Sequence, residues 1–441
     1  MILEGRTRQV EREPQGMNIS RRHMLGLLAA GVAASAAASA ARAGRKVTNF
    51  NGGGRALPPT RTRVYGEAGA PPMLSAQSPQ LMEEAIARYD VAVRAGGWPR
   101  LPRLRRILVA GSRKGVVRTL RKRLVMEGYL PPDTPISKRY DRQVAEAVMR
   151  FQRNHGLNVT GHVDFATLRE LNVPAGQRLD TLLANQPRVE WAVKGIAERF
   201  ILVNLPATQL ESVHNGSVYS RHNVIVGKPE RPSPSLRSHV SEINFNPFWT
   251  APESIARRDI VPEAWKSGNP KKFLQRRSIR VFDGFNGPEV DPDSLPWPNI
   301  DTKRFVFRQD PGDGNAMATV KINFPNPYAV YMHDTPTKQL FTSSQRYFSS
   351  GCVRVEQVHV LTEWILRRTP GWDRQHIEQV VRGKERIDVH VEQPPNVIWA
   401  YLTSWVTPDG NVHFRKDIYR LDGTGFISGQ PKPVRLAGEP G

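Results

Sequence analysis

The spacing of apolar residues changes near residue 198, and this change limits what the chain can fold into more than any other feature. Before residue 198, apolar residues recur at helical intervals, as on the packed face of a helix. Beyond it, short runs such as Phe200–Leu205 are typical of buried strands. With 441 residues, the chain is long enough for several domains. We therefore expect an α+β protein, in which a small helical domain precedes a mostly β domain.

Residues 115–175 predict a compact domain of three helices. Asp141 and Asp164 can cap the second and third helices, and Pro174 ends the third. The segment resembles the peptidoglycan-binding domain of bacterial wall enzymes. The matching residues are Leu120, Leu124, Gly128, Tyr129, Asp141, Val144, Val148, Phe151, Gln152, His155, Gly156, Leu157, Gly161, Thr167 and Leu168. The resemblance implies peptidoglycan, both glycan and stem peptides, as a binding partner.

Residues 198–405 predict the β domain. Further strands are expected in Ser217–Gly227, His239–Phe245, Ala318–Ile322, Tyr328–Met332, Ile387–Val391 and Val397–Val406. Residues 250–300 interrupt this pattern, because they are rich in Arg, Lys and Pro and contain helix-like pieces. We interpret them as a helical and loop-like cap inserted over a cleft.

The N-terminus has the three parts of an export signal. Arg21 and Arg22 precede an uncharged run from Met24 to Ala41, and Ala41-Arg42-Ala43 is a small-x-small cleavage pattern. The arginine pair favours the twin-arginine route. An uncleaved anchor is the alternative, although the run is short and rich in Ala and Gly for a spanning helix. We expect residues 1–43 to direct the protein to the periplasm.

Three other segments have distinct compositions. Residues 44–75 contain Gly and Pro breakers and predict a flexible linker. Residues 76–114 form a basic N-terminal segment, and residues 423–441 predict a disordered tail. Residues 94–123 hold eleven basic side chains and no acidic one. This stretch is either a solvated face or a surface for an anionic ligand.

The net charge of +22 indicates an anionic partner. Nucleic acid, an anionic membrane and an acidic polymer are the usual candidates. Export removes nucleic acid, which leaves the cell wall and lipid headgroups. No obligate protein partner is evident in the sequence. His155 has no partner histidine or cysteine at metal spacing, so no metal site is expected there.

Cys352 is the single cysteine of the chain, so it is either a packing residue or a working thiol. It follows Ser349-Ser350-Gly351 and precedes a segment, Glu356–Arg368, whose apolar spacing predicts a helix. A thiol close to a helix N-terminus and a basic residue has a lowered pKa. His333 could take its proton, and the amides around Cys352 could form an oxyanion hole.

This arrangement resembles the catalytic domain of the L,D-transpeptidases, in its large class with a peptidoglycan-binding domain. The matching residues are His333, Asp334, Thr335 and Pro336, then Leu340, Phe341 and Arg346, then Ser349, Ser350, Gly351, Cys352, Val353 and Arg354, with Trp249 and Pro252 upstream. The resemblance implies a mostly β catalytic domain. It also implies that Cys352 is the nucleophile and His333 the general base and acid.

The resemblance implies further roles around this pair. Tyr331, Ser350 and Gly351 would line the oxyanion region. Arg354 would either pair with a substrate carboxylate or brace the loop. Trp249 would either stack on the substrate or pack in a core.

The implied reaction needs no metal or organic cofactor. Cys352 would be acylated by a peptidoglycan tetrapeptide stem with loss of D-alanine, and transfer to a neighbouring amine would give a 3→3 cross-link. Carbapenem-type β-lactams would acylate the same thiol. Water or a lipoprotein lysine as acceptor would give an L,D-carboxypeptidase or a lipoprotein-attaching enzyme.

Two other readings of the site remain open. A papain-like endopeptidase places its cysteine before its histidine. Of the histidines after Cys352, which are His359, His376, His390 and His413, His390 would be the best substitute base. A non-catalytic wall-binding protein would use the helical domain and keep Cys352 as a passive residue.

Overall fold

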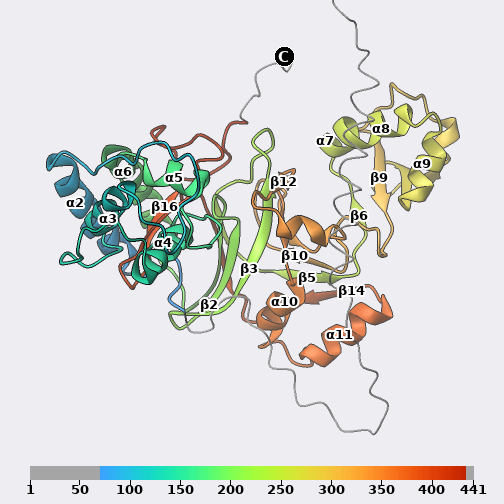
Figure 1. Ribbon diagram of the computed structural model, residues 1–441. Helices are drawn as coiled ribbons and strands as arrows, with labels where there is room; N and C mark the ends of the chain where they lie inside the picture. Colours follow the sequence, from blue (N-terminus) through green and yellow to red (C-terminus); the bar gives the residue numbers. More distant parts are fainter. Residues whose placement is uncertain (1–69, 434–441) are drawn as a thin grey trace, which may run out of the picture. The chain divides into compact units, whose positions relative to one another are not determined.

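The computed structural model describes residues 70–433, which belong to one compact unit. The expected export signal, most of the expected linker and the end of the expected tail lie outside the described residues. Within the described part, no helix is long and apolar enough to cross a membrane. The α+β class is confirmed, since a helical N-terminal region precedes a large β sheet (Figure 1).

The helical region contains three short helices between two long ones (Figure 1). They are α2 (Ser78–Arg94), α3 (Val116–Met126), α4 (Arg142–Asn154), α5 (Phe165–Leu171) and α6 (Ala175–Val193). The carboxylate of Asp141 accepts a hydrogen bond from the Val144 amide, and that of Asp164 accepts one from the Thr167 amide, so both predicted caps are present. Helices α3, α4 and α5 share one core, which includes Leu120, Val148 and Phe151.

An eleven-stranded sheet forms the centre of the β domain. Its strands are β1 (Arg199–Asn204), β2 (Gln209–His214), β3 (Ser217–Gly227), β4 (Leu236–His239), β5 (Glu242–Phe245), β10 (Val320–Asn323), β11 (Met332–His333), β12 (Tyr347–Ser349), β13 (Val353–Val355), β14 (Ile387–His390) and β15 (Asn396–Ala400). Their order is β14-β5-β10-β11-β13-β3-β2-β1-β15-β4, and β12 pairs with β3. Most neighbours are antiparallel, but three pairs are parallel: β11 with β13, β1 with β15, and β12 with β3.

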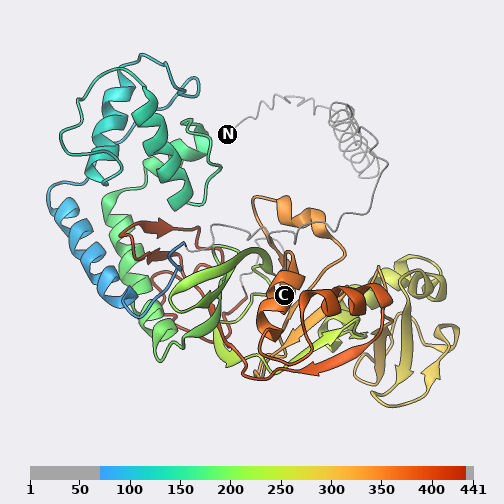
Figure 2. The same cartoon turned by 90° about the horizontal axis from the view of Figure 1, so that it is seen from below.

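Two helices, α10 (Val358–Leu366) and α11 (Arg374–Gly383), pack beside this sheet (Figures 1 and 2). Leu361, Trp364 and Ile365 of α10 are fully buried in the same core as strands β1, β3 and β5. The apolar positions that predict this helix from the sequence are therefore its packed face.

The inserted cap has a sheet and a core of its own. Its elements are β6 (Trp249–Thr250), α7 (Glu253–Ile255), a π-helix (Ala256–Ile260), α8 (Val261–Lys266), α9 (Pro270–Arg276), β7 (Ile279–Asp283), β8 (Glu289–Val290), a 3₁₀ turn (Pro292–Ser294) and β9 (Phe305–Gln309). The strand order is β6-β9-β7-β8. Helices and loops alone were expected, because arginines interrupt the strand pattern. Arg308, for example, lies 3.9 Å from the Phe282 ring centroid and covers this sheet with its stem.

Residues at both ends of the described chain correct two predictions. Met73 and Leu74, expected in a linker, are buried, and the Met73 amide donates to Glu211 Oε2 (2.8 Å). Residues 423–433, expected in a disordered tail, pair with the body of the domain. Gly429 and Ser235 exchange two backbone hydrogen bonds of 2.8 Å each.

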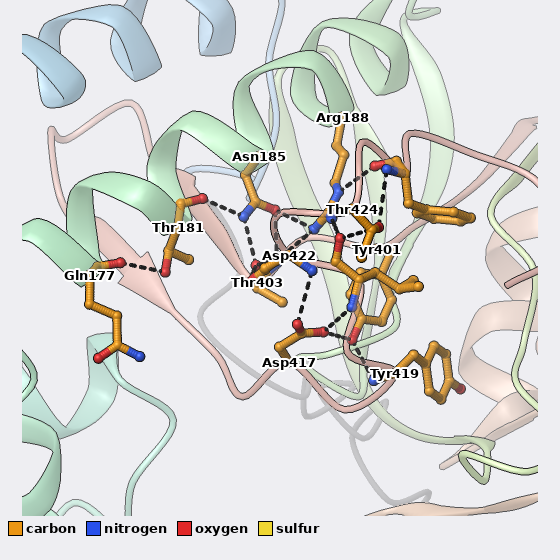
Figure 3. A network of polar contacts seen from close by, with 12 residues as sticks. Gln177, Thr181, Asn185, Arg188, Tyr401, Thr403, Asp417, Tyr419, Asp422 and Thr424 are labelled. Atoms are coloured by element: carbon orange, nitrogen blue, oxygen red, sulfur yellow. Dashed lines mark hydrogen bonds and ion pairs between the residues drawn. The ribbon is translucent and has the colours of Figure 1, made fainter. Parts of the chain in front are cut away.

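A polar network joins α6 to the C-terminal segment that follows the hairpin β16 (Ser404–Val406) and β17 (Val412–Phe414) (Figure 3). Arg188 Nη1 donates to Asp422 Oδ1 (2.6 Å), and Arg188 Nε donates to the Phe426 carbonyl (2.9 Å). Asn185 Nδ2 donates to Thr403 Oγ1 (2.6 Å). The Gly and Pro content of the tail predicted disorder, but side-chain hydrogen bonds from α6 hold the start of this segment in place.

Candidate active site

Strand pairing brings His333 and Cys352 to neighbouring positions of the sheet. His333 ends β11, opposite Lys321 of β10 on one side and Arg354 of β13 on the other. The Val353 amide donates to the Tyr331 carbonyl (3.1 Å), which sets Cys352 beside Tyr331. The parallel pairing of β11 with β13 therefore unites the two halves of the motif, which are separated by a connection that includes β12.

The turn before Cys352 is held by two serine hydroxyls. Ser349 Oγ donates to the Cys352 carbonyl (2.5 Å) and accepts from the Gly351 amide (3.2 Å). Ser233 Oγ donates to the Gly351 carbonyl (2.6 Å). Gly351 has a φ of +121°, which only glycine adopts without strain. The position of the thiol is thus fixed by the backbone on both sides of Gly351.

The predicted helix does not begin where the thiol could use its dipole. Strand β13 follows Cys352 directly, and α10 starts only at Val358, after Gln357 in a left-handed conformation. A helix dipole acts mainly within its first turn. The positive charge near the thiol instead comes from the side chains of Lys321 and Arg354.

The residues expected to line the oxyanion region differ in which of their donors are free. The Gly351 amide is already engaged by Ser349 Oγ, and Ser350 Oγ accepts from Arg231 Nη1 (3.0 Å). Among the described residues, the Cys352 amide donates no hydrogen bond. The Cys352 amide is therefore an unengaged donor for a developing oxyanion, and the Tyr331 hydroxyl, which faces the Cys352 sulfur in the resting site, is a second donor that the reaction can redirect there.

The Cys352 thiol is partly exposed, but its surroundings favour the protonated form. Burial raises the pKa of Cys352, while the backbone and hydroxyl of Tyr331 lower it, and Lys321 and Arg354 lower it further. The resting thiol is therefore protonated and must lose its proton during attack. Two cations and a hydroxyl stand ready to stabilise the thiolate once it forms.

His333 is 7% exposed and stays neutral in this setting. Burial lowers the pKa of His333 to about 3, Arg354 and Lys321 lower it too, and the backbone and charge of Asp334 act in the opposite direction. Nevertheless, His333 Nδ1 has no hydrogen-bond partner among the described residues. A neutral imidazole can accept a proton, which is what a general base requires.

The Asp334 carboxylate is not the orienting group of this histidine. It accepts from Thr319 Oγ1 (2.8 Å) and pairs with Lys338. Thr319 Oγ1 in turn contacts His359 Nε2 (2.8 Å). Asp334 therefore anchors the connection that follows β11.

Tyr331 links the thiol to the cap. Burial raises the pKa of the Tyr331 phenol, the Cys352 charge raises it further, and the side chain of Trp249 lowers it by hydrogen bonding. Trp249 belongs to β6 and also packs partly against the cap core, so both of its expected roles remain open. Lys321 Nζ lies 4.6 Å from the Tyr331 ring centroid, on the cation–π face.

Arg354 is half-buried and has one long contact, from Nη1 to Thr337 Oγ1 (3.5 Å). Its Nε atom is buried without a partner among the described residues. An unsatisfied guanidinium beside a thiol fits a substrate carboxylate better than a loop brace.

Four residues near the site were not singled out from the sequence: Lys321, Arg231, Ser233 and Tyr419. Arg231 donates to Asp259 of the cap π-helix (2.6 and 3.1 Å) and to Ser350, so it joins the cap to the turn of residues 349–352, which we call the catalytic turn. One feature of the sequence could have pointed to Lys321, because a lysine interrupts an otherwise apolar predicted strand. No sequence pattern points to Arg231, Ser233 or Tyr419, because the residues that they contact are distant in the chain.

A chain of hydrogen bonds connects the C-terminal segment to Gly351. Tyr419 Oη donates to the Gly227 carbonyl (2.6 Å) and accepts from the Ser233 amide (3.2 Å). Ser233 Oγ then donates to the Gly351 carbonyl. The Tyr401 hydroxyl, which binds Asp417 Oδ1 (2.6 Å), accepts from the Tyr419 amide (2.7 Å), as Figure 3 shows in part. The catalytic turn is therefore fixed by residues far from it in sequence.

Within residues 70–433, no group of three or more His, Cys, Asp and Glu side chains is placed to hold a metal ion.

Two family models match the chain. The model for the L,D-transpeptidase catalytic domain matches residues 198–377. The model described as "Putative peptidoglycan binding domain" matches residues 113–171. Both resemblances drawn from the sequence are thus confirmed.

A relative from Haemophilus influenzae, named "Putative L,D-transpeptidase", is 33% identical over 223 residues. The match covers 50% of this chain and 44% of the relative's length. An L,D-transpeptidase structure from Xylanimonas cellulosilytica matches with 14% identity, a TM-score of 0.21, and coverage of 68% and 99% of the two chains. An L,D-transpeptidase structure from Stackebrandtia nassauensis matches with 11% identity and a TM-score of 0.23, and the match covers 68% of this chain and 96% of that chain. TM-scores this low do not establish a shared architecture. By the sequence matches, residues 198–377 of the chain form an L,D-transpeptidase catalytic domain, and residues 113–171 form a domain of the putative peptidoglycan-binding family.

Proposed function

We propose that the protein is a cysteine L,D-transpeptidase that remodels peptidoglycan in the periplasm. Neutral His333 accepts the Cys352 proton while sulfur attacks the carbonyl of the third residue, a diamino acid, of a tetrapeptide stem. The Cys352 amide and the Tyr331 hydroxyl donate to the oxyanion. When the tetrahedral intermediate collapses, the bond to D-alanine breaks, and His333 returns the proton to the leaving amine. A thioester on Cys352 remains.

In the second step, the amine of a neighbouring stem attacks the thioester carbonyl. His333 takes a proton from this amine, the carbon–sulfur bond breaks, and the thiol is protonated again. The product is a 3→3 cross-link. Water as acceptor would release a tripeptide, which is the L,D-carboxypeptidase alternative, and a lipoprotein lysine would give protein attachment to the wall.

One observation supports this proposal above the others: the neutral, buried imidazole of His333 and the protonated thiol of Cys352 lie beside two cations on the adjacent strands β10, β11 and β13, with Cys352 directly before β13. A passive cysteine needs neither the cations nor the unengaged amide of Cys352. The same chemistry would let a carbapenem-type β-lactam acylate Cys352. The twin-arginine pattern supports export by that route, and the helical domain supports contact with the wall.

The test is turnover of a disaccharide-tetrapeptide by the purified protein, with products read by mass spectrometry, beside a Cys352→Ala variant. We expect a cross-linked dimer and free D-alanine, both absent with the variant. Tripeptide alone would establish the carboxypeptidase. No turnover, together with binding to intact sacculi, would favour a non-catalytic wall-binding protein. Circular dichroism should show that Cys352→Ala keeps the fold.

A further inference from the structure

A hollow of about 690 Å³ lies on the helical region, apart from the residues around Cys352. Its walls include three arginines, Arg100, Arg103 and Arg169, and three apolar residues, Leu101, Leu168 and Val173. We call it the arginine pocket. Its volume is within the range of small-ligand sites, about 300–1,000 Å³.

The arginine pocket is held open by side-chain clamps. Asn172 Oδ1 accepts from the Leu101 amide (2.8 Å), and Asn172 Nδ2 donates to the Leu101 carbonyl (2.9 Å). Trp98 Nε1 donates to the Val173 carbonyl (2.9 Å). These bonds fasten the segment that holds Arg100 and Arg103 to the end of α5. A ligand would therefore meet a preformed wall and would not have to order a loop.

The arginines of the pocket are uncompensated. Among the described residues, the side chains of Arg100, Arg103 and Arg169 have no salt bridge and no hydrogen bond. The buried arginines of the same region are paired: Arg121 with Asp141, Arg123 with Glu127, and Arg178 with Glu170. Exposed arginines outside the pocket, such as Arg118, are unpaired within the described part as well, so what distinguishes the three pocket arginines is that they surround one hollow. Leaving three guanidinium groups unpaired around an apolar floor favours a ligand with negative charge and small apolar groups.

Most of this pocket lies outside the matched peptidoglycan-binding domain. Of its lining residues, only Leu168 and Arg169 fall within residues 113–171. The basic segment before the domain, the connection between α5 and α6 and the start of α6 supply the others. The pocket therefore lies where the end of the matched domain meets this chain's own flanking segments.

We propose that the arginine pocket binds the carboxylate-bearing stem peptide of a peptidoglycan strand, at a site that shares no residue with the catalytic centre. Guanidinium groups pair with carboxylates in a bidentate manner, and the apolar floor suits the methyl groups of alanine residues. This inference rests on the proposed function for the identity of the anion. The pocket would hold a strand while Cys352 acts on a stem.

Hydrogen–deuterium exchange of the full-length Cys352→Ala protein tests the proposal, because it reads the two sites separately. The probe is a disaccharide-tetrapeptide. We expect slower exchange in residues 98–104 and 168–177, and independently in residues 331–354. Protection at the catalytic segment alone would overturn the pocket proposal. Protection at the pocket alone would leave the pocket proposal standing and count against the proposed function.

A second experiment uses charge reversal. Arg103→Glu combined with Arg169→Glu should weaken the probe's apparent affinity at residues 98–104 at least about tenfold, since two charge-assisted contacts become repulsive. The matched control combines Arg113→Glu with Arg118→Glu, two exposed arginines of the same domain outside the pocket, so the net charge changes by the same amount. An equal loss in this control would reduce the effect to net charge and overturn the proposal. Protection by inorganic phosphate, with none by the stem, would also overturn it.

Discussion

Two groups of cations in this molecule do different work because they differ in exposure. Lys321 and Arg354 are half-buried beside Cys352, and burial lowers the pKa of each. The arginines of the arginine pocket are exposed. Charges interact far more strongly when water is excluded, whereas exposed charges are screened by salt. The first group therefore tunes proton positions, and the second is suited to holding a ligand reversibly.

The largest effect should come from the buried pair itself. We expect His333→Ala to lower the turnover of soluble tetrapeptide by about 10²–10⁴-fold, the usual range for loss of a general base. Steady-state kinetics at neutral pH would measure it. The Arg118→Glu variant, at an exposed position outside both sites, should keep normal turnover of this soluble substrate. A near-normal rate for His333→Ala would mean that another group takes the thiol proton.

Buried histidines should also make the fold sensitive to acid. Burial lowers the pKa of His222 to about 4, while its backbone hydrogen bond to Glu356 raises it. Below pH 6.5 the unfolded chain binds a proton at His222, whereas the folded chain binds it only near pH 4. The free energy of unfolding therefore decreases as the pH falls from 6.5 toward 4. The loss is up to about 3 kcal/mol for this histidine.

Urea unfolding between pH 7 and pH 4 measures this dependence. His222→Gln should lower stability at pH 7 but give a shallower slope with pH. His162→Gln, at an exposed position, should leave the slope as it is in the native protein. Equal slopes in all three proteins would mean that His222 does not resist protonation.

A smaller effect is expected at the hydrogen-bond chain behind Gly351. Tyr419→Phe removes a hydroxyl that bonds Gly227 and Ser233. A lost buried hydrogen bond costs about 1–3 kcal/mol, and we expect about a tenfold loss in kcat from a looser catalytic turn. Tyr328→Phe is the matched control, because the Tyr328 hydroxyl makes no hydrogen bond in the described part. Unchanged kcat for Tyr419→Phe would separate the C-terminal segment from catalysis.

The smallest effect, and the most direct test of the contrast between cations, is a shift in pH dependence. Lys321 lowers the pKa of both Cys352 and His333. Lys321→Gln should therefore raise both, and the midpoint of thiol alkylation by iodoacetamide should move to higher pH. Arg103→Gln should not move it. If the pH midpoint of alkylation is the same in Lys321→Gln and in the native protein, water screens the charge of Lys321 from the thiol.

The sequence predicted the parts of the fold that depend on local pattern. The helices of residues 115–175, their aspartate caps and the α+β class follow from spacing and capping, and the family matches confirm both resemblances. His333 and Cys352 were found through a motif, and their roles remain predictions. The fold then shows why they meet, since β11 and β13 are parallel neighbours.

Long-range pairing accounts for what the sequence could not predict. Ser233 and Tyr419 lie far apart in the chain and act on Gly351 only through the folded backbone. The helix expected at Glu356–Arg368 is present as α10, but the strand β13 between Cys352 and this helix was not expected, because its pairing with β11 and β3 is long-range. The strands of the cap were not predicted, because arginines such as Arg308, which lies over the Phe282 ring, interrupt the alternation of apolar and polar residues that indicates a strand.

The parallel pairing of β1 with β15 has a consequence for how the chain reaches this fold. Phe200 pairs with Asn396, so almost the whole domain must be synthesised before β15, the second partner of β1, exists. Contacts so distant in sequence make folding slow, and strand edges that wait unpaired are prone to aggregation. Because β15 also pairs with β4, a ribosome-bound chain that ends before residue 396 exposes two open edges. The last strand of this sheet to be synthesised is thus the one that joins β4 to the rest of it.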